Sequence, residues 1–263
     1  MKYIGSKNRI SKELAPIIQS YITEDIKGYL EPFVGGANMI DKINHYNKIG
    51  CDIHRELIAL LNKAKNDVDS IPNEISEEEY NLVKDNKSNY EDWYVGLVGF
   101  CATFGAKYFG GYARVKKGNR NMPKEGIRNL KRQAPLLKGI EFKCCSFLDL
   151  PKDKIKGYVI YCDIPYKNTT KYSVNGFPYD EFYKWAIEMA KDNIVLISEY
   201  DMPEEFKCIW QKETKVNFDS NRESGDKKNK RVEKLFICNI GYINQESPIY
   251  DLWIYNIGVI WEW

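Results

Sequence analysis

The 263-residue sequence has few of the residues that build metal centres and disulfide frameworks. It contains two histidines and seven cysteines, an odd number, and no two cysteines follow the spacing C-x-x-C. Scattered cysteines of this kind argue against a zinc cluster and against a disulfide-stabilised secreted domain. We therefore expect no bound metal and a location in a reducing cytosol.

Long apolar segments are also missing. No uninterrupted apolar run approaches the roughly 18 residues of a membrane-spanning helix. The first ten residues, MKYIGSKNRI, lack the apolar centre of a signal peptide. With 43% hydrophobic and 29% charged residues, the chain has the composition of a soluble protein and is long enough to bury a substantial core. We expect no membrane association.

Acidic residues are nearly absent from one segment, residues 107–138. It holds ten Lys and Arg against the single acid Glu125, a local charge of +9 in a chain whose net charge is +2, so the remainder carries −7. Tyr108, Phe109, Tyr112 and several glycines lie between the basic residues. A concentrated positive charge with interleaved aromatics is typical of a nucleic-acid-binding surface, although a solvated loop is the alternative.

The rest of the sequence alternates between helix and strand patterns, which predicts an α/β fold with helices packed on a mostly parallel sheet. We expect a helix at 11–22 with Ser11 as its N-cap, and a helix at 179–191 with an apolar face formed by Phe182, Trp185, Ala186 and Met189. The other expected elements are strands at 28–33, 48–52, 157–163 and 193–200, a helix at 54–65, and a closing antiparallel pair at 206–216 and 232–240.

Two acids and a pair of glycines follow the first predicted strands. Glu31 ends one strand, Gly35 and Gly36 come directly after it, and Asp52 ends the next strand, 21 residues beyond Glu31. Glycines after a strand allow a tight turn and close approach of the backbone to a ligand, and an acid at this distance is suited to bind ribose hydroxyls. The glycines do not follow G-x-G-x-x-G, which disfavours a dinucleotide.

A third acid ends a later strand. Asp163 is followed by Ile164, Pro165 and Tyr166. The residue before a proline is held in an extended conformation, so the Ile164 carbonyl has a fixed direction beside the Asp163 carboxylate. Two adjacent acceptors and an aromatic face would hold a flat ring through its exocyclic amino group. As a purely structural residue, Asp163 would instead cap a helix or a turn.

Together these segments resemble a known family. Asp163-Ile164-Pro165-Tyr166 resembles the D-P-P-Y motif of amino-methyltransferases, and EPFVGG (31–36) resembles their S-adenosylmethionine loop. KYIGSK (2–7), FGAKYFGGYAR (104–114) and EKLFICN (233–239) resemble segments of Dam-type DNA adenine-N6 methyltransferases, in the same order over residues 1–240.

The resemblance implies a role for individual residues. Asp163, Ile164, Pro165 and Tyr166 would hold the target adenine. S-adenosylmethionine would be bound by Tyr3, Lys7, Phe33, Gly35, Asp52, Ser146, Phe147 and Asp163, with Asp149 as a rival for the position of Ser146 because the family often has an acid there. DNA would be bound by Arg114, Lys116, Lys117, Arg120 and Arg128, with Arg114 at a position that reads a base edge in relatives.

The resemblance also implies a domain organisation. A Rossmann-like catalytic domain with helices on both faces of its sheet would comprise residues 1–56 and 141–240. A mostly helical target-recognition domain, residues 57–140, would be inserted into it. Residues 241–263 would form a C-terminal extension to which we assign no role.

The activity implied is methyl transfer from S-adenosylmethionine to N6 of a flipped-out adenine in double-stranded DNA, without a metal. The protein would act as a monomer, with a dimer as the alternative, in the cytoplasm of a bacterial or phage-infected cell. One departure from the family pattern is Ile164, which stands where the family usually has proline. It leaves two alternatives open: a degenerate relative that binds DNA or cofactor without turnover, and an amino-methyltransferase acting on RNA, cytosine N4 or a protein glutamine.

Overall fold

A computed structural model describes residues 1–114, 121–166, 176–215 and 230–238. The chain divides into two compact units between Pro151 and Lys152. The described residues contain seven strands, and the strands of each unit are accompanied by helices, so the predicted mixed α/β class is confirmed.

The first unit contains a three-stranded parallel sheet in the order β3-β2-β1. Its strands are β1 (Gly28–Glu31), β2 (Lys48–Asp52) and β3 (Ile140–Cys144). All four residues of β1 are buried, which agrees with a strand covered on both faces. Glu31 pairs with Gly50 and Asp52 with Cys144, so the carboxyl ends of the three strands form one edge.

Five α-helices and six short 3₁₀ turns complete this unit. The helices are α1 (Ser11–Ser20), α2 (Arg55–Asn66), α3 (Glu77–Asp85), α4 (Asp92–Cys101) and α5 (Met122–Gln133). The 3₁₀ turns are Lys7–Arg9, Ile40–Lys42, Lys87–Asn89, Phe104–Ala106, Ala134–Leu137 and Phe147–Asp149.

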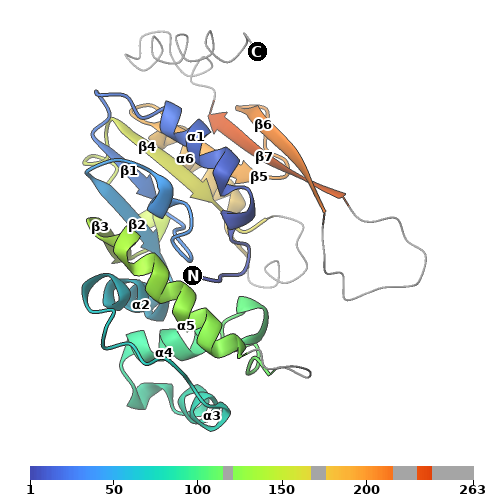
Figure 1. The fold of residues 1–263 in the computed structure, drawn as a ribbon. Coiled ribbons are helices and arrows are strands. Elements are labelled where there is room, and N and C mark those ends of the chain that lie inside the picture. The colour runs from blue at the N-terminus through green and yellow to red at the C-terminus, as the bar shows by residue number, and fades with distance from the viewer. Residues whose placement is uncertain (115–120, 167–175, 216–229, 239–263) are drawn as a thin grey trace, which may run out of the picture. The chain divides into compact units, whose positions relative to one another are not determined.

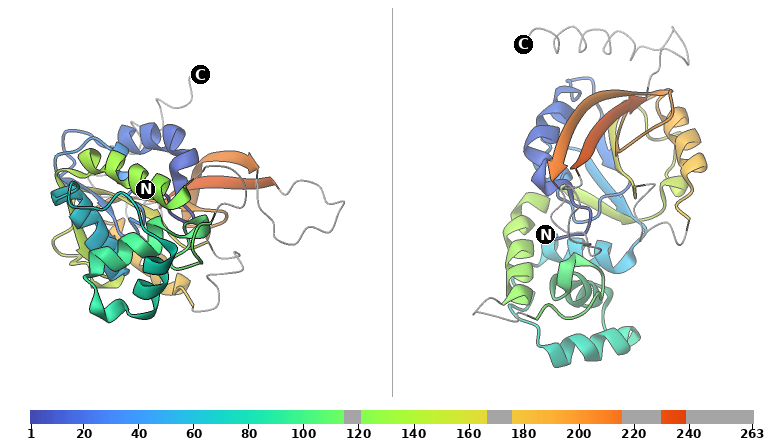
Figure 2. Two further views of the ribbon diagram at one scale, coloured as in Figure 1. Left: turned by 60° about the horizontal axis from the view of Figure 1, so that its bottom comes forward. Right: turned by 90° about the vertical axis from the view of Figure 1, so that its right-hand side faces the viewer.

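Helix α4 is the centre of the helical part of the unit. Seven of its ten residues are buried, and it contacts α2, α3 and α5 (Figures 1 and 2). Glycines allow the closest of these contacts. A Cβ on Gly96 of α4 would lie 2.2 Å from the Glu56 carbonyl oxygen of α2, and one on Gly126 of α5 would lie 2.3 Å from the Cys101 carbonyl oxygen of α4. The three helices are therefore packed backbone against backbone.

The second unit contains four strands in the order β4-β5-β7-β6. Strands β4 (Tyr158–Asp163) and β5 (Ile194–Glu199) are parallel, whereas β7 (Lys230–Cys238) is antiparallel to both β5 and β6 (Phe206–Lys215). Helix α6 (Tyr179–Met189) buries Phe182, Trp185, Ala186 and Met189, the apolar face expected from the sequence. Figure 2 shows β6 and β7 as a long twisted pair.

Most predicted elements are confirmed to within a few residues, including the end of the first strand at Glu31, and one detail is wrong. Ser11 is the first residue of α1 and not its N-cap. The cap position is held by Ile10, whose side chain has no hydrogen-bonding group, while the Ser11 hydroxyl donates to the Asn8 carbonyl at 3.0 Å. Helices α4 and α5 and strand β3 were not assigned as separate elements from the sequence.

Membrane-spanning helices and metal-binding clusters are both absent from the described residues. No helix among them is long and apolar enough to cross a bilayer. No cluster of three or more histidine, cysteine or acidic side chains in the same residues is arranged to hold a metal ion. The C-terminal extension predicted at 241–263 lies outside the described residues.

Candidate functional site

Asp52 and the glycine loop after β1 are joined by hydrogen bonds. The Gly35 N–H donates to Asp52 Oδ2 at 3.1 Å, and the His54 N–H donates to Oδ1 at 3.0 Å. Burial raises the pKa of the Asp52 carboxyl above its ordinary value, and these backbone donors offset part of the increase. The acid and the glycine loop predicted to bind one ligand are therefore brought together, with the carboxylate held in a fixed orientation.

Tyr3 covers the same loop. Gly35 has a φ of +48°, a conformation that strains any residue with a side chain, and a Cβ there would lie 2.8 Å from Cε1 of the tyrosine ring. A Cβ on Gly36 would lie 2.7 Å from Tyr3 Cβ. The ring also packs against Phe100 of α4, with centroids 5.7 Å apart. Only glycine fits beneath Tyr3, which explains why the loop contains two of them.

Phe33 and Phe147 lie together next to the loop, with ring centroids 5.5 Å apart. Phe147 is buried and begins the 3₁₀ turn that follows β3. The Ser146 hydroxyl accepts from the Leu148 N–H at 3.2 Å, and Asp149 Oδ2 accepts from the Ser146 N–H at 3.4 Å. Both polar side chains proposed for one ligand position thus form the cap of this turn.

Two further residues of the first unit bear on the site. Lys7 is buried, with 8% of its surface exposed, in the turn before α1. Ile53, which the sequence reasoning missed, follows Asp52 directly and is 76% exposed. A large exposed apolar side chain beside an oriented carboxylate is suited to cover the flat ring of a nucleoside. Its position immediately after a strand-end acid is the sequence signal that could have identified it.

The second unit fixes the stretch from Asp163 to Tyr166. Asp163 is the last residue of β4, where it pairs with Ser198 of β5, and the Ile164 side chain is buried with 2% exposed. The Pro165 carbonyl accepts a hydrogen bond from the Tyr179 hydroxyl at 2.8 Å. The backbone of this stretch is therefore held from β5 and from the start of α6, which agrees with a rigid pair of acceptors.

Tyr166 is held at both ends of its side chain. Its hydroxyl donates to Glu233 Oε2 at 2.7 Å, and its ring meets Tyr200 edge-on with centroids 4.2 Å apart. Burial and the nearby carboxylates of Asp163 and Glu233 raise the pKa of Tyr166, so the hydroxyl stays protonated and remains a donor. The ring orientation is fixed before any ligand binds.

The residues predicted to bind DNA are only partly described. Lys116, Lys117 and Arg120 lie outside the described residues. Arg114 is 72% exposed and forms a two-pronged ion pair with Glu77 at the start of α3, in which its Nε donates to Oε2 at 2.7 Å. Arg128 is exposed on α5. The segment 103–113, which directly precedes Arg114, is held by Thr103, whose hydroxyl donates to the Lys107 carbonyl at 2.8 Å and accepts from the Gly110 N–H at 2.9 Å.

Part of the chain is similar to known methyltransferases. Residues 3–96 match the sequence model of the D12 class N6 adenine-specific DNA methyltransferases. The chain is also 28% identical, over 203 residues, to the type II methyltransferase M.MjaIII of Methanocaldococcus jannaschii, a match that covers 66% of this chain and 70% of the relative.

The chain is therefore similar, over residues 3–96, to the D12 class N6 adenine-specific DNA methyltransferases and, over a longer stretch, to a type II methyltransferase. The predicted resemblance to Dam-type DNA adenine-N6 methyltransferases is thereby confirmed. A solved structure provisionally assigned as a methyltransferase from Thermoplasma acidophilum is also similar, at 6% identity and a TM-score of 0.23. That similarity covers 43% of this chain and about half, 52%, of the other, and carries no weight for the fold.

Proposed function

We propose that the first unit binds S-adenosylmethionine and that the second unit holds the target adenine, so that a methyl group is transferred to N6 of an adenine flipped out of double-stranded DNA. The observations that support this best are the oriented carboxylate of Asp52 and the fixed stretch that follows Asp163. Asp52 is held by two backbone N–H groups beside the glycine loop, and hydrogen bonds hold the Pro165 carbonyl and the Tyr166 hydroxyl.

The residues of the first unit fit the cofactor. The Asp52 carboxylate would accept from the ribose hydroxyls, Gly35 would let the backbone approach, and Ile53 and Phe147 would cover the adenine ring. Tyr3, Lys7, Phe33 and Ser146 would complete the site. When bound, S-adenosylmethionine supplies an electrophilic methyl group on a sulfonium. The Ser146 and Asp149 side chains both cap the turn that begins at Phe147, so this contact favours neither of them at the adenine end.

The residues of the second unit would make N6 of the adenine a better nucleophile. Its amino group would donate to the Asp163 carboxylate and to the Ile164 carbonyl, which draws the nitrogen lone pair out of conjugation with the ring. Pro165 restricts the backbone of Ile164, and the Tyr166 ring would stack on the base. Positioning and preorganised acceptors would supply most of the rate enhancement, and extrusion of the base would bring N6 within reach.

DNA would be held by the predicted recognition segment. Arg114, Lys116, Lys117, Arg120 and Arg128 would contact phosphates and base edges, with Arg114 suited to guanine. Releasing Arg114 from Glu77 costs little, because an exposed ion pair contributes at most about 1 kcal/mol. The domain division proposed is the one expected from the sequence, with residues 57–140 inserted between the two parts of the catalytic domain.

The first test is to express the protein in cells that lack adenine methylation and to map modified bases by long-read sequencing. N6-methyladenine confined to one short motif would establish double-stranded DNA as the substrate and give the recognition sequence. Methylation without a motif would overturn site specificity, and an unmodified genome with folded protein present would point to another substrate or to a protein that binds without turnover.

Asp163→Asn gives a test of the proposed catalytic acceptor. We expect turnover to fall by about 100-fold or more, the effect typical of removing one preorganised electrostatic group. Affinity for S-adenosylhomocysteine should change much less, because the glycine loop and Asp52 are untouched. Turnover is measured with purified protein, radiolabelled S-adenosylmethionine and a duplex that carries the mapped motif.

The matched control is Asp201→Asn. Its side chain is 94% exposed in the same unit and lies 3.9 Å from the Lys234 ammonium. We expect wild-type turnover for this variant. Near wild-type turnover by Asp163→Asn would remove Asp163 from the mechanism.

A further inference from the structure

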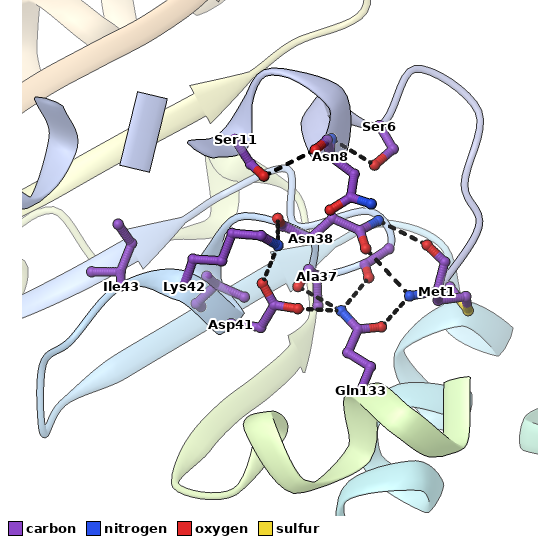
Figure 3. A network of polar contacts seen from close by, with 12 residues as sticks. Met1, Ser6, Asn8, Ser11, Ala37, Asn38, Asp41, Lys42, Ile43 and Gln133 are labelled. Atoms are coloured by element: carbon purple, nitrogen blue, oxygen red, sulfur yellow. Dashed lines mark hydrogen bonds and ion pairs between the residues drawn. The ribbon is translucent and has the colours of Figure 1, made fainter. Parts of the chain in front are cut away.

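Helix α5 ends in a buried glutamine whose side chain contacts the glycine loop. Gln133 is 6% exposed, and its Nε2 donates to the carbonyls of Gly36 at 3.1 Å and Ala37 at 2.8 Å and to Asp41 Oδ2 at 2.8 Å (Figure 3). Its Oε1 accepts from the amine of Met1. One amide thus satisfies two backbone carbonyls of the loop, groups that are costly to bury without partners.

The same loop forms one side of the proposed cofactor site. Gly35 donates to Asp52, and the carbonyls that Gln133 holds belong to the next two residues. Asn38 continues the network, because its Nδ2 donates to the Met1 carbonyl at 3.0 Å and its carbonyl accepts from Lys42 (Figure 3). A shift of Gln133 therefore shifts backbone that lies within two residues of the group orienting Asp52.

The outer face of α5 is basic. Lys124, Arg128 and Arg132 are spaced four residues apart, which places them on one side of the helix, and all three are exposed. Among the described residues, none of the three forms an ion pair. A row of cations on a helix is suited to bind successive phosphates of a nucleic-acid backbone.

Close packing makes α5 a stiff connection between these two features. Gly126 lies halfway along the helix against the Cys101 carbonyl of α4, with no room for even one methyl group. Lys2 and Glu125, 3.4 Å apart, join the helix to the segment that carries Tyr3. A displacement of α5 caused by binding at its basic face would therefore move the glycine loop through Gln133 and the segment of Tyr3 through Lys2.

We propose that Gln133 is a positioning residue that couples DNA binding on α5 to cofactor binding in the glycine loop. Phosphates bound by the basic face would restrict α5, and Gln133 would transmit that restriction to the Gly36 and Ala37 carbonyls, so that the cofactor orders less of the loop when it binds. The coupling is reciprocal, so the cofactor would also tighten DNA binding. This inference rests on the proposed function, because it assumes that the loop binds the cofactor and that α5 binds DNA.

The test is a thermodynamic cycle with S-adenosylhomocysteine and a duplex that carries the methylation motif. Its dissociation constant is measured by calorimetry with free protein and with protein saturated by the duplex. For the wild type we expect the duplex to tighten binding at least about fivefold, the lower end of typical coupling between sites. The coupling ratio is the dissociation constant of S-adenosylhomocysteine for free protein divided by that for duplex-saturated protein. Gln133→Met keeps an unbranched side chain of similar length but cannot donate a hydrogen bond, and we expect its coupling ratio to fall to about one.

The matched control is Gln19→Met. Gln19 also bridges a loop of the first unit, by accepting from the Asn44 N–H at 2.8 Å and donating to its carbonyl at 3.2 Å, but it does not contact the glycine loop. The coupling ratio of Gln19→Met should stay at the wild-type value. Hydrogen exchange of the peptide covering residues 33–41 is a second measurement: the duplex should slow it in the wild type and in Gln19→Met, but not in Gln133→Met.

The outcomes separate this inference from the function on which it rests. A wild type that binds neither S-adenosylhomocysteine nor DNA overturns both. A wild type that binds both without coupling, or a Gln133→Met variant that keeps the wild-type ratio, overturns the role of Gln133 alone. A purely structural role would weaken binding equally with and without DNA and leave the ratio unchanged.

A second variant keeps the test valid if Gln133→Met does not fold. The triple variant Lys124→Gln, Arg128→Gln, Arg132→Gln changes only exposed side chains and leaves Gln133 in place. With duplex at saturating concentration, we expect its ratio also to fall to about one. A wild-type ratio in this variant would overturn the route through α5.

Discussion

At the scale of single residues, the protein combines a buried acid with donors that orient it. Burial raises the pKa of Asp52, so its charge opposes folding at neutral pH, yet the carboxylate is the form that accepts from ribose hydroxyls. The N–H groups of Gly35 and His54 reduce the cost. A group of this kind contributes to ligand binding at the expense of stability.

The pH dependence of cofactor binding should report this acid. Because the folded-state pKa of Asp52 is raised, its carboxyl becomes protonated at a higher pH than an ordinary aspartate. We expect affinity for S-adenosylhomocysteine to fall as pH decreases through that raised value. Asp52→Asn should bind about tenfold or more weakly at neutral pH and show a flatter profile, as measured by calorimetry at several pH values.

The contribution of Asp52 to protein stability should depend on pH in the opposite direction from its contribution to cofactor affinity. The contribution of Asp52 is favourable below its unfolded-state pKa and is lost as pH rises through the raised folded-state pKa. Denaturant titrations of the ligand-free wild type and Asp52→Asn should therefore differ least at acid pH.

For the binding measurement, an affinity for S-adenosylhomocysteine that depends on pH in Asp52→Asn as it does in the wild type would show that another group titrates.

At the scale of elements, the helical part of the first unit depends on close approaches that glycine alone allows. Gly96 and Gly126 lie in helix interiors, where glycine lowers helix stability by roughly 1 kcal/mol relative to alanine. Both lie against a backbone carbonyl of a neighbouring helix. Helix propensity alone therefore disfavours glycine at both positions, and the contact with a neighbouring helix explains it.

Gly126→Ala should therefore destabilise the protein although alanine favours helix. Its Cβ would meet the Cys101 carbonyl oxygen at 2.3 Å, and overpacking of a core typically costs about 1–3 kcal/mol. The free energy of unfolding is measured by urea titration. Lys124→Ala on the exposed face of the same helix is the control and should change stability by less than about 0.5 kcal/mol. A Gly126→Ala variant as stable as the control would show that α4 and α5 can separate without cost.

At the scale of the whole molecule, charge is distributed unevenly along the chain. Residues 107–138 carry +9 and the remainder −7, so the net charge of +2 conceals a strong positive region. In the described part of that region, helix α5 arranges three cations in a row. Such a row acts on a polyanion through counterion release, which makes binding depend steeply on salt.

The triple variant Lys124→Gln, Arg128→Gln, Arg132→Gln should lower both DNA affinity and its salt dependence. Each lost phosphate contact reduces the slope of log affinity against log salt by about 0.9, so the full set should reduce it by roughly 2.7. Fluorescence anisotropy of a labelled duplex at several salt concentrations gives the slope. The control Lys12→Gln, Lys27→Gln, Lys152→Gln removes the same charge from exposed lysines outside the basic segment and should leave the slope nearly unchanged.

The sequence by itself determined the elements whose residues repeat with a clear period and the motifs that follow strands. The strands ending at Asp52 and Asp163 and the helix beginning at Tyr179 were predicted because apolar periodicity and turn residues act locally. The resemblance to a family was predicted from the order of its motifs, and the comparisons confirm that resemblance.

Only the tertiary structure decided which groups meet across long stretches of chain. Three features depend on how the elements pack. They are the hydrogen bonds from Gln133 to Gly36 and Ala37, the hydrogen bond from Tyr166 to Glu233, and the exposure of Ile53 beside Asp52. The glycines of α4 and α5 show the same limit, because the contact that requires them lies on another helix. Local patterns specify a residue's conformation, whereas its partners are fixed by the fold.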